Sequence, residues 1–139
     1  MIVLDTNIIS EIVRPAPSGS VISWLNRQRT IDLAVTTVTL GELAYGVEAL
    51  PDGEKRTALQ YSIDRFIDVA FADRVLEFDR PSAVAYGAVM AARRRAGRPM
   101  SVPDGQIAAM TMRHEAMLAT RNVRDFEGCG VPLVDPFDD

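Results

Sequence analysis

The segment Ile2-Val3-Leu4-Asp5-Thr6-Asn7 carries the strongest local indication of the fold. Its first three residues form a short apolar run, which predicts a buried β-strand that ends at Asp5. Thr6 or Asn7 would then cap a short helix that continues to Val13. An acidic residue that directly follows a buried strand lies at the edge of a parallel sheet where ligands bind. Asp5 is therefore a candidate functional residue, and the alternative is a helix cap.

Short apolar segments alternate with amphipathic segments along the rest of the chain. Helices are expected where apolar residues recur with helical spacing, and strands where the apolar run is short. The expected strands cover residues 2–4, 32–36, 75–78, 117–119 and 132–134. The expected helices cover residues 6–13, 21–25, 38–50, 54–71, 81–96 and 103–115. This alternation predicts a single α/β domain over residues 1–139, with a mostly parallel sheet covered by helices on both faces.

The composition excludes several classes of function. The chain has 139 residues, of which 47% are hydrophobic and 24% are charged, as in ordinary globular domains. One cysteine and one histidine rule out an internal disulfide framework, a Cys-rich zinc site and a His-pair metal motif. The net charge of −4 provides no overall attraction for nucleic acid, so contact with phosphate would require a local basic patch.

The sequence contains no visible signal for export or membrane insertion. Asp5 interrupts the first apolar run before the core of a signal peptide could form. The longest apolar stretch, residues 33–50, contains Glu42 and Glu48 and is too short and too polar to span a bilayer. We therefore expect a cytoplasmic protein with no membrane partner, which also agrees with its single cysteine. Phosphate-binding loops of the GxxxxGK[ST] and GxGxxG types are absent from the sequence.

Two further acidic residues are candidates for a site shared with Asp5. Glu42 lies on the predicted 38–50 helix but outside its apolar stripe, so it would be either a solvent-exposed glutamate or one paired with a cation. Asp104 follows Ser101 by three residues, a spacing that is also typical of a capping box at a helix N-terminus. Each of these residues has a structural interpretation when it is considered alone.

Asn122 and Asp125 follow the fourth predicted strand. Asn122 is neutral, so it could offer a carbonyl oxygen to a metal or its water but no negative charge. Asp125 could reach the same site or cap the local turn, and we favour the capping role. A set of oxygen-bearing side chains without His or Cys suits Mg²⁺ or Mn²⁺. A cation held by carboxylates most often serves phosphate chemistry.

Four segments, in this order, resemble the motifs of the PIN-domain family, in particular the VapC-type toxins of bacterial toxin–antitoxin pairs. They are IVLDTN at residues 2–7, TLGELAYG at 39–46, PDGQIAA at 103–109 and LATRNVRDF at 118–126. Together they span nearly the whole chain. The stretches IISE at residues 8–11, Arg14-Pro15 and Trp24-Leu25 also resemble the FitB-type subgroup.

The resemblance implies a PIN fold and a ribonuclease that depends on Mg²⁺ or Mn²⁺. It also implies an RNA substrate, a homodimer and a small antitoxin partner, through which alone the protein would associate with operator DNA. Some family members have an acid at the position of Asn122, so the fourth ligand remains open between this residue and Asp125. The implied metal-binding and catalytic residues are Asp5, Glu42 and Asp104, with Thr6, Thr120, Asn122 and Asp125 as supporting residues.

A ribonuclease with net negative charge requires local basic surface. The candidate RNA-binding residues are Arg93, Arg94, Arg95, Arg98, Arg121 and Arg124. The dense run over residues 93–98 is equally typical of a helix C-terminus, where positive charge is favourable. The main alternative function is a catalytically weak interaction module, whose acidic pocket would accept an arginine from a small antitoxin or DNA-binding partner. A second alternative is a DNA nuclease on the same scaffold.

Overall fold

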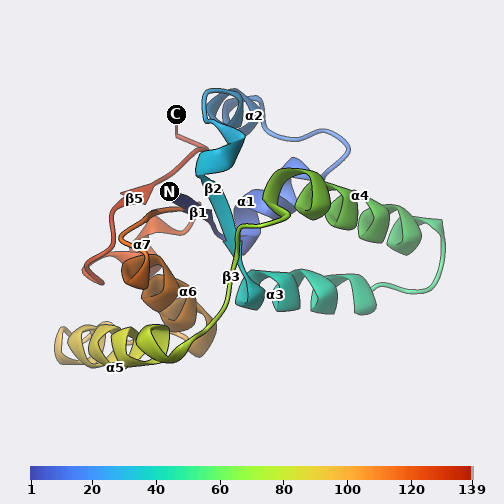
Figure 1. Cartoon of the computed structure of the whole chain (residues 1–139). Helices are drawn as coiled ribbons and strands as arrows, with labels where there is room; N and C mark the ends of the chain where they lie inside the picture. Colours follow the sequence, from blue (N-terminus) through green and yellow to red (C-terminus); the bar gives the residue numbers. More distant parts are fainter. Residues whose placement is uncertain (139) are drawn as a thin grey trace.

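The computed structural model describes residues 1–138 and is built around a five-stranded sheet (Figure 1). The strands are β1 (Ile2–Leu4), β2 (Leu33–Thr36), β3 (Val75–Leu76), β4 (Met117–Ala119) and β5 (Leu133–Val134). Their order across the sheet is β3-β2-β1-β4-β5, and every neighbouring pair is parallel. The predicted α/β class and mostly parallel sheet are thus confirmed.

Seven α-helices connect or follow the strands within residues 1–138. They are α1 (Thr6–Ile12), α2 (Gly19–Asn26), α3 (Thr37–Glu48), α4 (Glu54–Phe71), α5 (Arg80–Arg95), α6 (Val102–Arg113) and α7 (Val123–Phe126), with a 3₁₀ turn at Thr30–Asp32. The helices that the sequence predicts are all present, within a few residues at their ends. The 3₁₀ turn and α7 were not predicted, because elements this short show no periodicity. None of the helices in residues 1–138 is both long and apolar enough to span a membrane.

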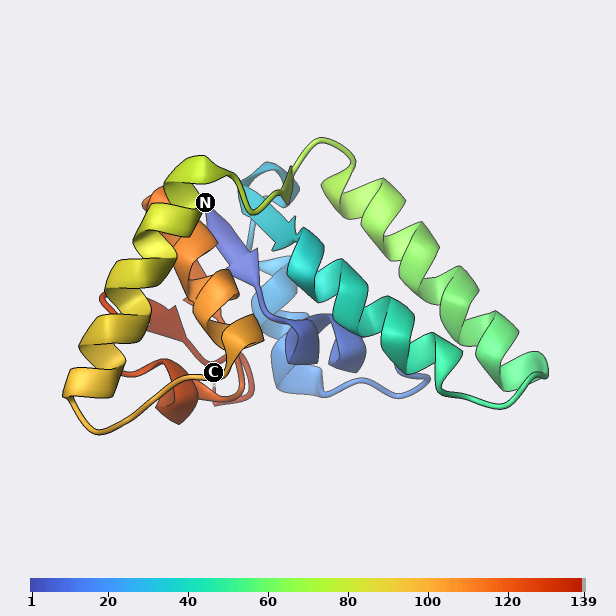
Figure 2. The same ribbon diagram turned by 90° about the horizontal axis from the view of Figure 1, so that it is seen from below.

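Alternate residues of the strands point to opposite faces of the sheet and fill two separate cores. Val3, Ala34 and Leu118 pack in the core that α5 and α6 cover. Leu4, Val35 and Ala119 pack in the core that α1 to α4 cover. Figure 2 shows the α3–α4 pair and the α5–α6 pair on opposite sides of β1. Because both faces are covered, the strands are almost entirely apolar, as the short apolar runs predict.

The order of the strands places the chain's polar motifs at one edge of the sheet. The connections from β1 lead to β2 on one side, whereas β4 and β5 lie on the other side, so β1 and β4 border the point where the sheet changes direction. Ligands bind at such a point, beyond the carboxyl ends of the strands. Asp5 follows β1 and Thr120 follows β4, and the Asp5 N–H donates to the Ala119 carbonyl at 2.9 Å.

The residues at the helix ends correct one prediction and confirm another. Asp5 occupies the N-cap position of α1 and accepts a hydrogen bond from the Thr6 N–H, so the prediction that Thr6 or Asn7 caps this helix is wrong. Thr6 is already the first helical residue and provides the donor. Ser101 caps α6 as its spacing predicts. Gly97, with φ of 73°, follows the end of α5, where the left-handed conformation favours glycine.

Candidate metal and catalytic site

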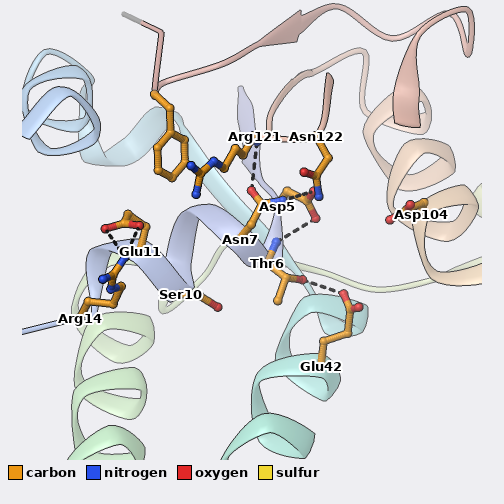
Figure 3. Close-up of a pocket in the computed structure, with 11 residues that line it drawn as sticks. Asp5, Thr6, Asn7, Ser10, Glu11, Arg14, Glu42, Asp104, Arg121 and Asn122 are labelled. Carbon is orange, nitrogen blue, oxygen red and sulfur yellow. Dashed lines mark hydrogen bonds and ion pairs between the residues drawn. The ribbon is translucent and has the colours of Figure 1, made fainter. Parts of the chain in front are cut away.

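One cavity of about 490 Å³ opens at the carboxyl edge of β1 (Figure 3). Three acidic side chains that are far apart in sequence line this cavity: Asp5 after β1, Glu42 on α3 and Asp104 on α6. The structure thus brings the three predicted metal-binding residues to one place. The complete lining consists of Asp5, Thr6, Asn7, Ser10, Glu11, Arg14, Glu42, Asp104, Arg121, Asn122 and Phe137.

Asp5 is the buried centre of the site, with only 4% of its surface exposed. Its Oδ1 accepts a hydrogen bond of 2.8 Å from the Thr6 N–H. Its Oδ2 accepts one of 2.8 Å from the Thr120 hydroxyl and one of 3.2 Å from the Asn7 side-chain amide. These donors fix the orientation of the carboxylate. Asp5 therefore both caps α1 and faces the cavity, so a capping role does not exclude a role in the site.

No described residue provides a cationic partner for the charge of Asp5. The pKa of this carboxyl is raised from 3.8 to about 6 as the net result of several effects, of which burial is the largest. The hydrogen bonds from Thr120 and Thr6 lower the pKa and so offset part of this effect. The negative charges of Asp104 and Glu42 add to the rise caused by burial. A cation bound in the cavity would relieve both the burial penalty and the repulsion.

Glu42 lies at the exposed mouth of the cavity and is positioned by Thr6. The Thr6 hydroxyl donates to Glu42 Oε1 at 2.6 Å and also lies 3.1 Å from the hydroxyl of Thr39 on the same helix. The prediction left Glu42 open between an exposed and a paired glutamate. It is exposed, but a short hydrogen bond from α1 holds it over the site.

Asp104 is half-buried in the first turn of α6. Burial raises the pKa of its carboxyl, and a hydrogen bond with Ser101 opposes that shift. The charges of Asp125 and Glu42 raise the pKa further, whereas the charge of Arg93 lowers it. The pKa values of the Asp5 and Asp104 carboxyls are therefore both above the ordinary range of an aspartate.

The chemistry of these donors fits a hard divalent cation. Mg²⁺ commonly takes only one or two protein carboxylates and keeps several waters. Within residues 1–138, no three His, Cys, Asp or Glu side chains close around a common point as a ready ligand cage. Asp5, with Glu42 and Asp104 acting directly or through water, matches the open type of site, and the absence of sulfur and imidazole at the cavity disfavours zinc.

The structure distinguishes the two candidates for a fourth ligand. Asn122 lines the cavity, and its N–H donates to the Thr120 hydroxyl at 3.0 Å. It also occupies the N-cap position of α7 without a capping hydrogen bond from its side chain. Asp125 is exposed, lies outside the cavity lining and is the third residue of α7. The prediction that Asp125 caps this turn is therefore wrong, because the turn begins at Asn122.

An ion pair lines the wall of the cavity beside α1. Glu11 is buried and accepts hydrogen bonds from Arg14 Nη1 at 3.0 and 3.3 Å and from the Ser18 N–H at 3.0 Å. The Ser18 hydrogen bond is the largest cause that lowers the pKa of Glu11, and the Arg14 contacts lower it further. This acid therefore has the cationic partner that Asp5 lacks.

A family model described as the PIN domain matches residues 2–128. The chain belongs to the PIN-domain family. It is 36% identical over 138 residues to the VapC ribonuclease Y4jK of Sinorhizobium fredii, and the match covers 99% of each chain. It is 35% identical to the toxin FitB of Neisseria gonorrhoeae, over the full length of both chains. A solved structure of FitAB bound to an IR36 DNA fragment superposes with a TM-score of 0.92 at 34% identity, covering 99% of this chain and 96% of that one.

The arginines predicted to bind RNA do not form one surface of this PIN domain. Arg93 is buried, and its guanidinium donates to the backbone carbonyls of Asp125 and Glu127, so it cannot belong to an exposed RNA-binding surface and the prediction is wrong for this residue. Arg98 donates to the Arg124 carbonyl at 2.8 Å. Arg94, Arg95 and Arg124 are exposed but lie outside the cavity lining, which contains only Arg121 of the six.

Five lining residues were not predicted as site residues. Asn7, Ser10, Glu11 and Arg14 lie within or beside stretches that carry the family resemblance, so their presence in motifs was an available indication. Phe137 lies after the last strand in a segment without periodicity. Its position depends on how the chain folds back from β5, which the local sequence does not reveal.

Proposed function

We propose that this PIN domain is an endoribonuclease that hydrolyses RNA phosphodiesters with Mg²⁺ or Mn²⁺ and acts in the cytoplasm as the toxin of a toxin–antitoxin pair. The observation that carries the proposal is the convergence of Asp5, Glu42 and Asp104 on one cavity. The raised pKa values of Asp5 and Asp104 support a bound cation, since both carboxyls lack a sufficient positive partner. The names of the relatives, VapC ribonuclease and toxin FitB, support the reaction and the biological role.

In this proposal the residues of the chain hold and orient the reacting groups. A bound Mg²⁺ or Mn²⁺ supplies Lewis acidity and lowers the pKa of a bound water. Asp5 would hold the cation with a carboxylate that its three hydrogen-bond donors keep in one orientation. Glu42, held by the Thr6 hydroxyl, and Asp104, fixed at the start of α6, would complete the site from the two neighbouring helices.

The direct test compares RNA and DNA oligonucleotides of the same sequence. The purified protein should cleave RNA with Mg²⁺ or Mn²⁺, lose activity in chelator and recover it when metal returns. Ca²⁺ should bind and support little turnover, because its looser geometry positions the reacting oxygens poorly. Asp5→Asn protein purified in parallel excludes a contaminating nuclease. Full activity in excess chelator would contradict the proposal, and preferential cleavage of DNA would favour the DNA nuclease instead.

We propose further that a small antitoxin protein inhibits this activity and provides the only contact with operator DNA. The solved structure of FitAB bound to an IR36 DNA fragment supports an association with a partner protein and with DNA. Expression of the chain alone should slow bacterial growth, whereas expression of the Asp5→Asn variant should not. Co-expression of the product of a small neighbouring reading frame should restore growth. Equal growth inhibition by both forms would remove the cavity from the mechanism of toxicity and favour the interaction module.

A homodimer is the remaining part of the proposal. Sedimentation at micromolar concentration should give about twice the chain mass of 15.2 kDa. A monomer at high concentration would contradict the dimer without affecting the metal site, because the three carboxylates and the residues that position them all come from one chain.

A further inference from the structure

The cavity has two electrostatically different walls. Asp5, Glu42 and Asp104 line one part of it, and the Glu11–Arg14 ion pair and Arg121 line the rest. Glu11 and Arg14 largely neutralise each other. Of the arginines that line the cavity, Arg121 is the one that makes no ion pair with a described residue. Arg121 acts on Glu11 through its charge, but it forms no ion pair with a described carboxylate. Its position beside the other three acids of the cavity therefore requires an explanation.

Arg121 is kept away from the three acids by contacts at both of its ends. Its backbone N–H donates to Asn7 Oδ1 at 3.1 Å. Its guanidinium lies over the ring of Phe137, with the central carbon 4.3 Å from the ring centroid. Figure 3 shows Arg121 on the opposite side of Asp5 from Asp104. Stacking occupies a face of the guanidinium and leaves its N–H groups, which lie in its plane, available to a ligand.

Phe137 is a fixed platform for this stack. Its carbonyl accepts a hydrogen bond of 3.1 Å from the Ser20 hydroxyl on α2, and its N–H donates to Asp135 Oδ1 at 2.9 Å. The side chain is partly buried against the core on the α1–α4 face of the sheet. An arginine that stacks on a fixed ring loses less conformational entropy when it binds a ligand than one that is free in solvent.

We propose that Arg121, stacked on Phe137, is a phosphate-binding subsite for the nucleotide next to the one that is cleaved. The proposal rests on the proposed ribonuclease function. The three acids and their cation would serve the scissile phosphate, so the adjacent phosphate requires a separate positive group. A guanidinium is suited to this role because its paired N–H donors match two phosphate oxygens. Asn7 links the subsite to the reaction centre, since its Oδ1 holds the Arg121 backbone and its Nδ2 donates to Asp5.

The test measures RNA binding in chelator, where cleavage is absent. The probe is a short fluorescein-labelled oligouridylate, and binding is followed by fluorescence anisotropy at several salt concentrations. Arg121→Gln should weaken binding about tenfold and reduce the slope of log K against log salt by about 0.7, the value for one lost phosphate contact with a single strand. Arg121→Lys should retain the slope. Phe137→Leu should weaken binding about threefold with an unchanged slope, because the charge remains but its platform is lost.

The matched control is Arg80→Gln, which removes the same charge from an exposed arginine at the first position of α5, outside the cavity. It should leave both the affinity and the salt slope unchanged. If Arg121→Gln behaves like this control, or if the wild-type protein does not bind the oligouridylate, the subsite is overturned. Asp5→Asn separates the two proposals, because it should bind the probe at least as well as wild type. If RNA binding depends on Arg121 but the wild-type protein does not cleave RNA under any condition, the subsite would be supported. Only the proposed ribonuclease activity would then be rejected.

Discussion

Asp5 and Glu11 lie at opposite ends of α1, line the same cavity and are both buried, with 4% and 6% of their surfaces exposed. Their carboxyl pKa values nevertheless shift in opposite directions. Glu11 is paired with Arg14 and accepts the Ser18 N–H, and the pKa of its carboxyl is lowered. Asp5 accepts only neutral donors, and burial raises the pKa of its carboxyl to about 6. The charge of Glu11 is therefore balanced within the fold, whereas the charge of Asp5 requires an added cation.

This difference is a guide to function that residue type alone does not provide. A buried acid with an internal cationic partner stabilises structure, and a buried acid that has hydrogen bonds but no cation is a candidate ligand. Exact replacement of carboxylate by amide in both residues tests the distinction directly.

The largest expected effect is on cleavage. Asp5→Asn should reduce RNA cleavage on the order of a thousandfold, because the neutral amide cannot hold the cation that stabilises the transition state. Glu11→Gln should keep activity within about threefold of wild type, because it leaves the metal site unchanged. The variant removes only the charged acceptor of Arg14 and Ser18. Its melting temperature should fall instead. Both variants are compared with wild type by initial rates of RNA cleavage with Mn²⁺ and by thermal melting. Equal loss of cleavage in the two variants would contradict the different roles assigned to Asp5 and Glu11.

The second prediction concerns the pH dependence of stability in chelator. Between pH 3.8 and about 6, folded Asp5 retains a proton that the unfolded chain has lost, so its contribution to the free energy of unfolding falls as pH rises through this window. The shift corresponds to about 3 kcal/mol, since one pKa unit is worth about 1.4 kcal/mol. Glu11 has the opposite sign: the stability that it contributes is present above pH 4.5 and is lost as pH falls through its lowered pKa.

Denaturant titrations from pH 4 to pH 8 measure this effect as the difference between wild type and Asp5→Asn. Addition of Mg²⁺ at pH 7.5 should stabilise wild type and leave Asp5→Asn nearly unchanged, because binding to the folded state alone raises stability. A difference that does not vary with pH would show that the Asp5 carboxyl is not perturbed.

The third prediction concerns the hydroxyl that orients Asp5. Thr120→Val removes the 2.8 Å hydrogen bond to Asp5 Oδ2 and should weaken Mn²⁺ binding about tenfold, a usual effect of losing a group that orients a metal ligand. Thr111→Val is the matched control, because Thr111 is also fully buried but donates to the Ile107 carbonyl within α6. It should leave Mn²⁺ affinity unchanged. Calorimetric titration of both variants with Mn²⁺ measures these affinities. Equal Mn²⁺ affinities of the two variants would show that Thr120 does not contribute to the metal site.

The sequence was sufficient to predict the sheet and three of the four acids that line the cavity, because these depend on local pattern. A short apolar run followed by Asp5 predicts a strand and an acid at its carboxyl end, and the topology of a parallel sheet then places such ends together. Glu42 and Asp104 were found by the motifs around them. The extent to which the pKa values of Asp5 and Asp104 are raised depends on burial and on charges brought close only by folding, so it does not follow from the local sequence.

The arginines show the limit of local pattern most clearly. Arg93 and Arg94 are adjacent in a charged last turn, and nothing in the sequence distinguishes them. The helix rotates one of them toward α7, where backbone carbonyls of Asp125 and Glu127 bind it, and leaves the other in solvent. The Arg121–Phe137 stack was equally hidden, because it joins two loops that meet only after β4 and β5 have paired.

The smallest expected effects concern the fourth ligand. Asn122 lines the cavity and its side chain makes no capping hydrogen bond, so Asn122→Ala should reduce cleavage a few-fold at nearly unchanged thermal stability. Asp125 lies in the first turn of α7, where a negative charge is worth about 0.3–1 kcal/mol, so Asp125→Ala should lower stability by at most that amount. Its effect on Mn²⁺ affinity should be less than twofold, because it acts on Asp104 through its charge and not as a lining residue. Metal titration and thermal melting of both variants measure these effects. An Asp125→Ala protein that melts normally but binds Mn²⁺ more weakly than Asn122→Ala would make Asp125 the fourth ligand.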